Sequence, residues 1–337
     1  MPDIVQWDAV REQYHKGGLL LGNGASMAVH QGFGYASLYE VARQREHLTE
    51  AVAGVFAAFG TNDFELVLRR LWQAQLVNTS LSIPPGAVEE AYELVRNALI
   101  ATVRDSHVKY DDAAPHFSAI WAFMQPFRTV VSLNYDLTVY WAMMAGNSAL
   151  GGSWFKDCFL HGEFVENWQS RRDPLGAMTD ACLVFYPHGN LVLARTPGFE
   201  ERKIAAGSNS NLLEKILAEW ESNNAAPLFI CEGTAEHKKR AIENSAYLQR
   251  VFREVIPACG ETLVIYGWNA APQDRHILEQ VKRARAGGLH AVAVSVFRDN
   301  QNEAQRVQEL LQGIGMVEIS FFDAESPGCW IHPREND

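Results

Sequence analysis

The sequence has few cysteines and no long apolar run. Its five cysteines stand singly among 337 residues, without the close pairs that hold structural zinc or the dense, even-numbered set of a disulfide framework. We interpret them as reduced, mostly buried thiols. No apolar run is long enough to span a membrane, and the amino terminus has acidic residues and no continuous apolar stretch of a signal peptide. We therefore expect a cytoplasmic protein that does not contact the membrane.

Positive charge is also scarce. The formal net charge of -11 argues against broad binding to a phosphate backbone, so nucleic acid is not an expected partner. The chain is otherwise that of an ordinary globular protein, with 47% hydrophobic and 20% charged residues. Its length is sufficient for a full hydrophobic core in one large or two modest domains.

Two segments differ in character from the rest of the chain. Apolar residues recur at helical spacing in residues 63–76 and again in residues 92–103, which predicts a helical insertion over about 38–122. Residues 145–180 are rich in Gly, Trp and Asp and show little periodicity. They are typical of long surface loops or a lid.

Short apolar runs of strand type alternate with helical patterns elsewhere, most regularly in the last third. A helix through Ala304, Val307 and Leu310 is expected to end at Gly313. The alternation predicts one α/β domain with a Rossmann-like, doubly wound parallel sheet and right-handed crossovers. The runs are contained in GLLLG, RTVVSLNYD, CLVFYPHGNLVLAR, APLFICEGT, ETLVIYGWN, LHAVAVSVF and MVEISFF.

Polar and glycine-rich turns follow five of these runs. In a doubly wound sheet, ligands bind beyond the carboxyl ends of the strands, so these turns are expected to converge on one crevice. Each turn alone can also be explained as a helix cap or as a simple turn that ends a strand. The candidate residues are Gly22, Asn23, Gly24, Ala25 and Ser26; Asn134 and Asp136; His188; Glu232, Gly233 and Thr234; and Gly267, Trp268 and Asn269.

The first of these turns is compatible with a bound phosphate. Two glycines remove the Cβ atoms at a tight turn, and backbone N–H groups that open the next helix can face an anion. An ordinary strand-to-helix turn explains the same residues, and the glycine pair alone does not separate the two interpretations.

Three motifs in this order resemble those of a known family. The stretches LLLGNGAS, VVSLNYD and YPHGNL, with a helical segment between the first two, are similar to the sirtuin-like NAD-binding core. The blocks PLFICEGTAEHKKRAI and LVIYGWNAAPQDRHIL further resemble an uncharacterised bacterial family built on that core. The resemblance covers roughly residues 18–297.

The resemblance implies roles for the candidate residues. Gly22, Gly24, Ala25 and Ser26 would hold the pyrophosphate of NAD. Asn134 and Asp136 would lie beside the nicotinamide ribose, and His188 would match the catalytic histidine. The turns that begin at Glu232 and Gly267 would border the adenosine half.

The chain also departs from the sirtuin deacylases. It lacks the paired cysteines of their zinc module, and VHQGFGYASLYE stands where they have Gly-Ile-Pro and an arginine. Sirtuin-like proteins of this reduced kind resemble the NAD-consuming effectors of bacterial antiphage defence. The resemblance therefore implies an NAD glycohydrolase with NAD as substrate, no metal, and a regulatory protein partner or a homo-oligomer.

Two other functions are open at this point. One is an NAD-dependent deacylase or ADP-ribosyl transferase acting on a protein; the other is a catalytically inactive nucleotide sensor or assembly module. A second histidine, His161, also follows a short strand-like run. We favour His188 as the catalytic histidine because it lies between two clear strand patterns, whereas His161 lies in the irregular segment.

Overall fold

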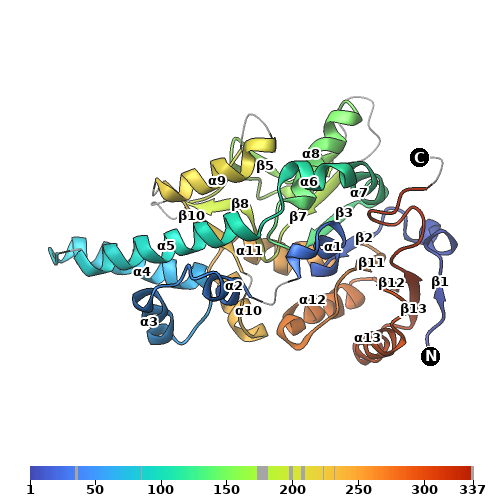
Figure 1. Ribbon diagram of the computed structural model, residues 1–337. Coiled ribbons are helices and arrows are strands. Elements are labelled where there is room, and N and C mark those ends of the chain that lie inside the picture. Colours follow the sequence, from blue (N-terminus) through green and yellow to red (C-terminus); the bar gives the residue numbers. More distant parts are fainter. Residues whose placement is uncertain are drawn as a thin grey trace.

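A parallel sheet forms the centre of the protein (Figure 1). The structure is a computed structural model that describes residues 1–34, 37–84, 86–172, 181–196, 200–205, 209–222, 224–230 and 232–334. Within these residues the sheet has eight strands in the order β1-β13-β12-β11-β2-β3-β7-β4. The strands are β1 (Ile4–Val5), β2 (Gly18–Leu21), β3 (Thr129–Ser132), β4 (Phe155–Lys156), β7 (Cys182–Phe185), β11 (Thr262–Tyr266), β12 (Ala291–Val296) and β13 (Glu318–Asp323).

The order of the strands makes the sheet doubly wound. After the edge strand β1, the chain forms β2 near the middle of the sheet, moves outward through β3 to β4 and β7, and later returns to β11 on the other side of β2. From there it continues outward through β12 to β13. All residues of β2, β3, β7 and β11 are buried, as expected for parallel strands covered by helices on both faces. The parallel, Rossmann-like arrangement is confirmed, and the winding reverses between β2 and β11.

Two strands expected in this sheet belong to another one. An antiparallel sheet has the order β10-β8-β9-β6-β5, with β8 and β10 paired to each other. The assignment of these two runs to the parallel sheet was wrong, because both are completely buried and burial alone does not reveal strand direction. The strands are β5 (Phe159–Leu160), β6 (Glu163–Phe164), β8 (Gly189–Arg195), β9 (Glu201–Lys203) and β10 (Ala226–Phe229).

The helical insertion lies between β2 and β3, as predicted. Helices α4 and α5 pack side by side and extend away from the parallel sheet (Figure 1). Side-chain caps mark where several of these helices begin, among them Ser37 for α2, Thr49 for α3 and Asp63 for α4. The segment from the end of β2 to β3 contains α1 (Asn23–Val29), α2 (Leu38–Gln44), α3 (Glu50–Phe59), α4 (Phe64–Ser80), α5 (Gly86–Ser106), α6 (Tyr110–Ala113) and α7 (Phe117–Met124).

The remaining helices connect the strands of the two sheets. They are α8 (Thr138–Ala149), α9 (Leu212–Glu221), α10 (Ala235–Glu243), α11 (Ala246–Arg250), α12 (Arg275–Ala286) and α13 (Gln301–Gly313). Helix α13 ends at Gly313, as predicted, but Gly313 is its last helical residue and the left-handed glycine that follows is Gly315, with φ of 92°. In the segment expected to be loops, α8 continues to Ala149 and the short strands β4 to β6 follow, whereas residues 173–180 lie outside the described part of the chain.

No single helix in the described part of the chain has both the length and the hydropathy needed to cross a membrane. Helices α3 and α4 meet both requirements only when taken together, and the two are bent by 88° relative to each other.

Candidate functional site

A crevice lies at the carboxyl ends of the central strands, where the winding of the sheet reverses. It is a cavity of about 430 Å³. Three of the predicted turns and His188 meet in it, although they come from four separate parts of the sequence. Its lining includes Gly22, Asn23, Gly24, Asn134, Tyr135, Asp136, His188, Lys238, Gly267, Trp268, Asn269, Gln273 and Asp274.

The glycine turns after β2 and β11 pack directly against each other. The N–H of Gly24 donates to the carbonyl of Gly267 at 2.8 Å. A Cβ on Gly22 would lie 2.6 Å from the Cα of Trp268, and a Cβ on Gly24 would lie 2.8 Å from the Cα of Gly267. Close approach of two backbones therefore explains these glycines. The Gly24 N–H, which was expected to face a phosphate, donates to the Gly267 carbonyl instead and is not available to a ligand.

Other members of the two turns support the local structure. The Asn23 amide donates to the carbonyl of Phe33 at 3.1 Å, and the Asn269 amide oxygen accepts the N–H of Ala271 at 3.2 Å. Ala25 is completely buried and is not among the residues that line the crevice. These contacts hold the two turns in place around the opening.

Asn134 connects the turn after β3 to the turn after β2. Its amide nitrogen donates to the carbonyl of Gly22 at 2.9 Å and to the hydroxyl of Ser26 at 2.8 Å. Both amide hydrogens are therefore engaged, and the side-chain oxygen has no hydrogen bond within the described residues. Because Asn134 lines the crevice, this oxygen is the part of the amide that is available to a ligand.

Asp136 is fixed by hydrogen bonds on both carboxylate oxygens. One oxygen accepts the Ser26 hydroxyl at 2.5 Å, and the other accepts the N–H of Thr138 at 2.8 Å at the start of α8. The Asn190 amide donates to the Asp136 carbonyl at 2.7 Å and thereby ties this turn to the start of β8. Asp136 and Ser26 thus form the frame that positions Asn134.

A buried histidine that the sequence analysis did not select supports the same turn. Nε2 of His107 accepts the N–H of Leu137 at 3.0 Å, and its Nδ1 lies 2.7 Å from the carbonyl of Val108. Because Nε2 accepts, the proton is on Nδ1. Burial lowers the pKa of His107, so the neutral ring acts as a cap for α8.

His188 pairs with a second buried histidine, His276 on α12. Their Nε2 atoms are 2.8 Å apart, and each residue is 2% exposed. Burial lowers the pKa of His188 well below its usual value, and the nearby charge of Lys238 lowers it further. Burial also lowers the pKa of His276, to about 4. Both rings are therefore neutral at pH 7, and the N–H of one donates a hydrogen bond to the unprotonated Nε2 of the other.

Asp274 completes this cluster and balances its charge. One oxygen accepts the ammonium of Lys238 at 2.8 Å, and the other accepts the indole N–H of Trp268 at 3.3 Å. Asp274, His188 and His276 offer ligand atoms within 4.8 Å of one another, which is the spacing of a metal site. Because the Lys238 cation already neutralises the carboxylate, we interpret the cluster as a histidine pair beside an ion pair.

The turn at residues 232–234 lies next to the crevice rather than in it. The carboxylate of Glu232 accepts the Ser37 hydroxyl at 2.8 Å and the N–H of Tyr39 at 3.2 Å. Burial raises its pKa. Thr234 caps α10 by accepting the N–H of His237 at 3.3 Å. Glu232, Gly233 and Thr234 line a neighbouring cavity of about 580 Å³, which shares Gln273 with the crevice.

The alternative histidine is far less enclosed. His161 is exposed and lies in the turn between β5 and β6, with φ of 51°. It is not among the residues that line the crevice.

Comparison with known proteins defines the family. Residues 19–330 match the family described as Domain of unknown function (DUF4917). The chain belongs to this family, and the match contains every residue of the crevice. A comparison with curated proteins found no significant match.

Proposed function

We propose that the protein is an NAD glycohydrolase whose reaction takes place in the crevice. The observation that carries the proposal is the convergence of Asn134, His188 and the glycine turns at the point where the winding of the sheet reverses. Dinucleotides bind at this point in open α/β sheets. The resemblance of the three motifs to the sirtuin-like core supports the same substrate.

The crevice has groups suited to breaking the bond between ribose C1′ and the nicotinamide nitrogen. Nicotinamide leaves as a neutral molecule with the electron pair of that bond, so the leaving group needs no acid. The Asn134 side-chain oxygen can accept a ribose hydroxyl and hold the sugar. A water molecule then bonds to C1′, and Nε2 of His188, which is neutral at pH 7, takes the proton of that water in exchange for its hydrogen bond with His276.

Space and charge also suit a dinucleotide. A pocket of 430 Å³ is at the lower end of ligand sites in general, but it adjoins the 580 Å³ cavity at Gln273. Lys238 lines the crevice as an ion pair with Asp274, and the remaining N–H groups of its ammonium can donate to a phosphate oxygen. Asp136, by contrast, has both oxygens engaged by the protein, so we assign it a positioning role.

The test is nicotinamide release from NAD by the purified protein in the absence of any peptide. The proposal predicts release with ADP-ribose as the second product. Release that depends strictly on an acylated peptide would favour a deacylase instead. NAD binding without release would favour a nucleotide sensor.

A further inference from the structure

A second cavity lies between the helical insertion and the antiparallel sheet. Its volume is about 830 Å³, and its walls come from α4, α10, α11 and the strands β8 and β9. Five arginines line it, two on α4, one on β8, one on α10 and one on α11. They are Arg69, Arg70, Arg195, Arg240 and Arg250. We call this space the arginine cavity.

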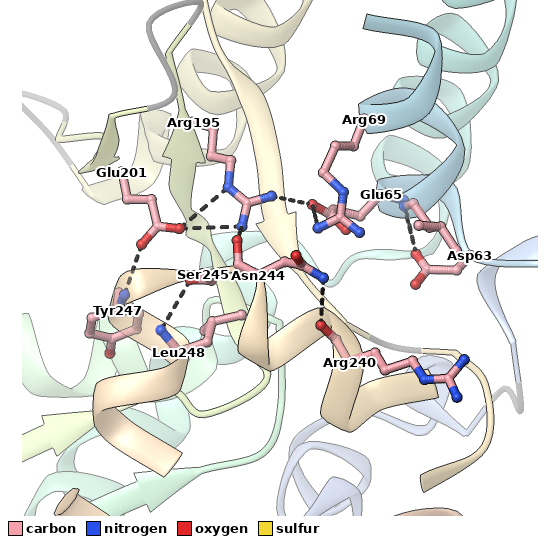
Figure 2. A network of polar contacts seen from close by, with 11 residues as sticks. Asp63, Glu65, Arg69, Arg195, Glu201, Arg240, Asn244, Ser245, Tyr247 and Leu248 are labelled. Atoms are coloured by element: carbon pink, nitrogen blue, oxygen red, sulfur yellow. Dashed lines mark hydrogen bonds and ion pairs between the residues drawn. The ribbon is translucent and has the colours of Figure 1, made fainter. Parts of the chain in front are cut away.

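A buried ion-pair network fixes one wall of the arginine cavity (Figure 2). The guanidinium of Arg195 donates to Glu65 at 2.8 Å, to Glu201 at 3.2 Å and to the carbonyl of Asn244 at 2.9 Å. The Arg195 side chain is 6% exposed. This arginine is therefore fully used in joining α4 to β9 and to the end of α10.

Five acidic residues of the described chain line the cavity, and three of them, Asp63, Glu201 and Glu232, are compensated; Glu166 is exposed and pairs with Arg250 at 3.8 Å, and Glu200 is exposed. Glu201 is bound by Arg195 and by the N–H of Tyr247, and Glu232 is bound by Ser37 and Tyr39. The pKa of Asp63 is raised to about 7 by burial and by the nearby Glu65, so its carboxyl is substantially protonated at neutral pH.

The arginines on the helices keep donor capacity. Arg70 contacts the Phe59 carbonyl at 3.5 Å, and Arg240 pairs with Glu236 on its own helix at 3.4 Å, with 69% of its side chain exposed. Nη1 of Arg69 is buried and makes no hydrogen bond within the described residues; its contact with Glu65 is an ion pair at 3.8 Å. Cations on facing helices are stabilised by an anion between them.

Aromatic side chains accompany these cations. Phe59, Phe164 and Tyr247 also line the arginine cavity. Tyr247 is buried against Phe164, so the half-buried rings of Phe59, which Arg70 covers at 5.0 Å, and Phe164 are the ones that a ligand can reach. A guanidinium matches the geometry of a phosphate, and an aromatic ring can stack on a nucleobase. We propose that the arginine cavity binds a nucleoside phosphate, at a site separate from the crevice.

Helix α10 separates the two sites. His237 and Arg240 face the arginine cavity, whereas Lys238 faces the crevice, where it pairs with Asp274. No residue that lines the crevice also lines the arginine cavity. The 580 Å³ cavity lies between them and shares Glu232, Gly233 and His237 with the arginine cavity.

The test is calorimetric titration of ADP into the full-length protein and into the double variant Arg70→Gln/Arg240→Gln. Both arginines lie on helix surfaces, so the variant is expected to fold, and its melting temperature checks this. Loss of two charge-assisted hydrogen bonds should weaken ADP binding at this site by at least about tenfold. The matched control is Arg43→Gln, since Arg43 is 60% exposed and pairs with Glu40 on its own helix as Arg240 pairs with Glu236. It should bind ADP as the wild type does.

Asn134→Ala distinguishes failure of this proposal from failure of the proposed function. It should lose NAD cleavage yet keep ADP binding, because ADP lacks the nicotinamide ribose that Asn134 would hold. ADP binding that is unchanged in the double arginine variant would place ADP outside the arginine cavity and overturn the proposal, as would a wild type that does not bind ADP. Inorganic pyrophosphate that binds as tightly as ADP would contradict the role given to the aromatic residues.

Discussion

Nε2 of His188 and Nε2 of His276 face each other at 2.8 Å in the protein interior. Only one of the two nitrogens donates, so the other is an acceptor whose lone pair is directed at its neighbour. The pair adjoins the crevice through His188, whereas His276 is not among the residues that line it. In the proposed reaction His276 would therefore act through His188, as a positioning residue.

The histidine pair predicts an unusual pH dependence. The pKa of His276 is lowered to about 4 and that of His188 lies well below its usual value, so the neutral, active form persists in moderately acidic solution. The rate of nicotinamide release should remain constant as the pH falls from 8 through 6.5 and should decrease only at a lower pH. The rate measured against pH checks this. An acidic limb near 6.5, the value of a free histidine, would contradict it.

Substitution of His276 should move this acidic limb. Nearby His276 contributes to lowering the pKa of His188. In His276→Gln this contribution is lost, so the limb should shift toward higher pH. We expect kcat to fall and KM to change little, since His276 does not reach the substrate. An unchanged pH profile would show that the two histidines are not coupled in the reaction.

The glycine contact between the two turns predicts a loss of stability. In Gly24→Ala the added Cβ would lie 2.8 Å from the Cα of Gly267, and the backbone cannot yield easily. We expect the free energy of unfolding to fall by about 1–3 kcal/mol. Gly54→Ala, in α3, is the matched control because its Cβ meets nothing within 4 Å, and it should raise stability by about 0.5–1 kcal/mol. Urea denaturation measures the free energy of unfolding of both variants. Equal changes in Gly24→Ala and Gly54→Ala would contradict the tight contact between Gly24 and Gly267.

Asp63 predicts a second pH effect, on stability. Its carboxyl keeps a proton in the folded protein up to about pH 7 but ionises near 3.8 when unfolded, so its contribution to stability falls as the pH rises between these values. Asn also caps a helix and carries no charge. Asp63→Asn should therefore gain stability relative to the wild type as the pH rises from 4 to 8, by about 4 kcal/mol at most. Denaturation at pH 4 and at pH 8 measures the difference in the free energy of unfolding between the variant and the wild type. A difference that is the same at both pH values would contradict the raised pKa of Asp63.

Much of the fold could be predicted because buried parallel strands have a recognisable sequence pattern. The runs that form β2, β3, β11 and β12 are short, apolar and followed by polar turns, which predicts both their existence and the edge at which those turns meet. The antiparallel sheet could not be predicted in this way. Strands β8 and β10 are equally buried, and the partner of a fully buried strand depends on packing between distant segments.

The candidate site was predictable only in part, for a related reason. Residues that directly follow a strand were found, but Lys238, Asp274 and His276 lie on or beside helices, and their convergence depends on how α10 and α12 pack. His276 was visible in the stretch PQDRHIL, just after the turn at residues 267–269, yet nothing in the sequence indicates that it meets His188. The close backbone contact of Gly24 with Gly267 likewise appears only in three dimensions.

The most direct test of the account is nicotinamide release from NAD by the wild type and by Asn134→Ala, His188→Ala and His161→Ala, with melting temperatures to confirm folding. We predict that the first two variants lose about a hundredfold or more in rate, as expected for a positioned base or orienting group. His161→Ala, whose side chain is exposed outside the crevice, should cleave NAD normally. Normal cleavage by folded Asn134→Ala and His188→Ala, or loss of activity in His161→Ala alone, would contradict the assignment of the crevice as the catalytic site.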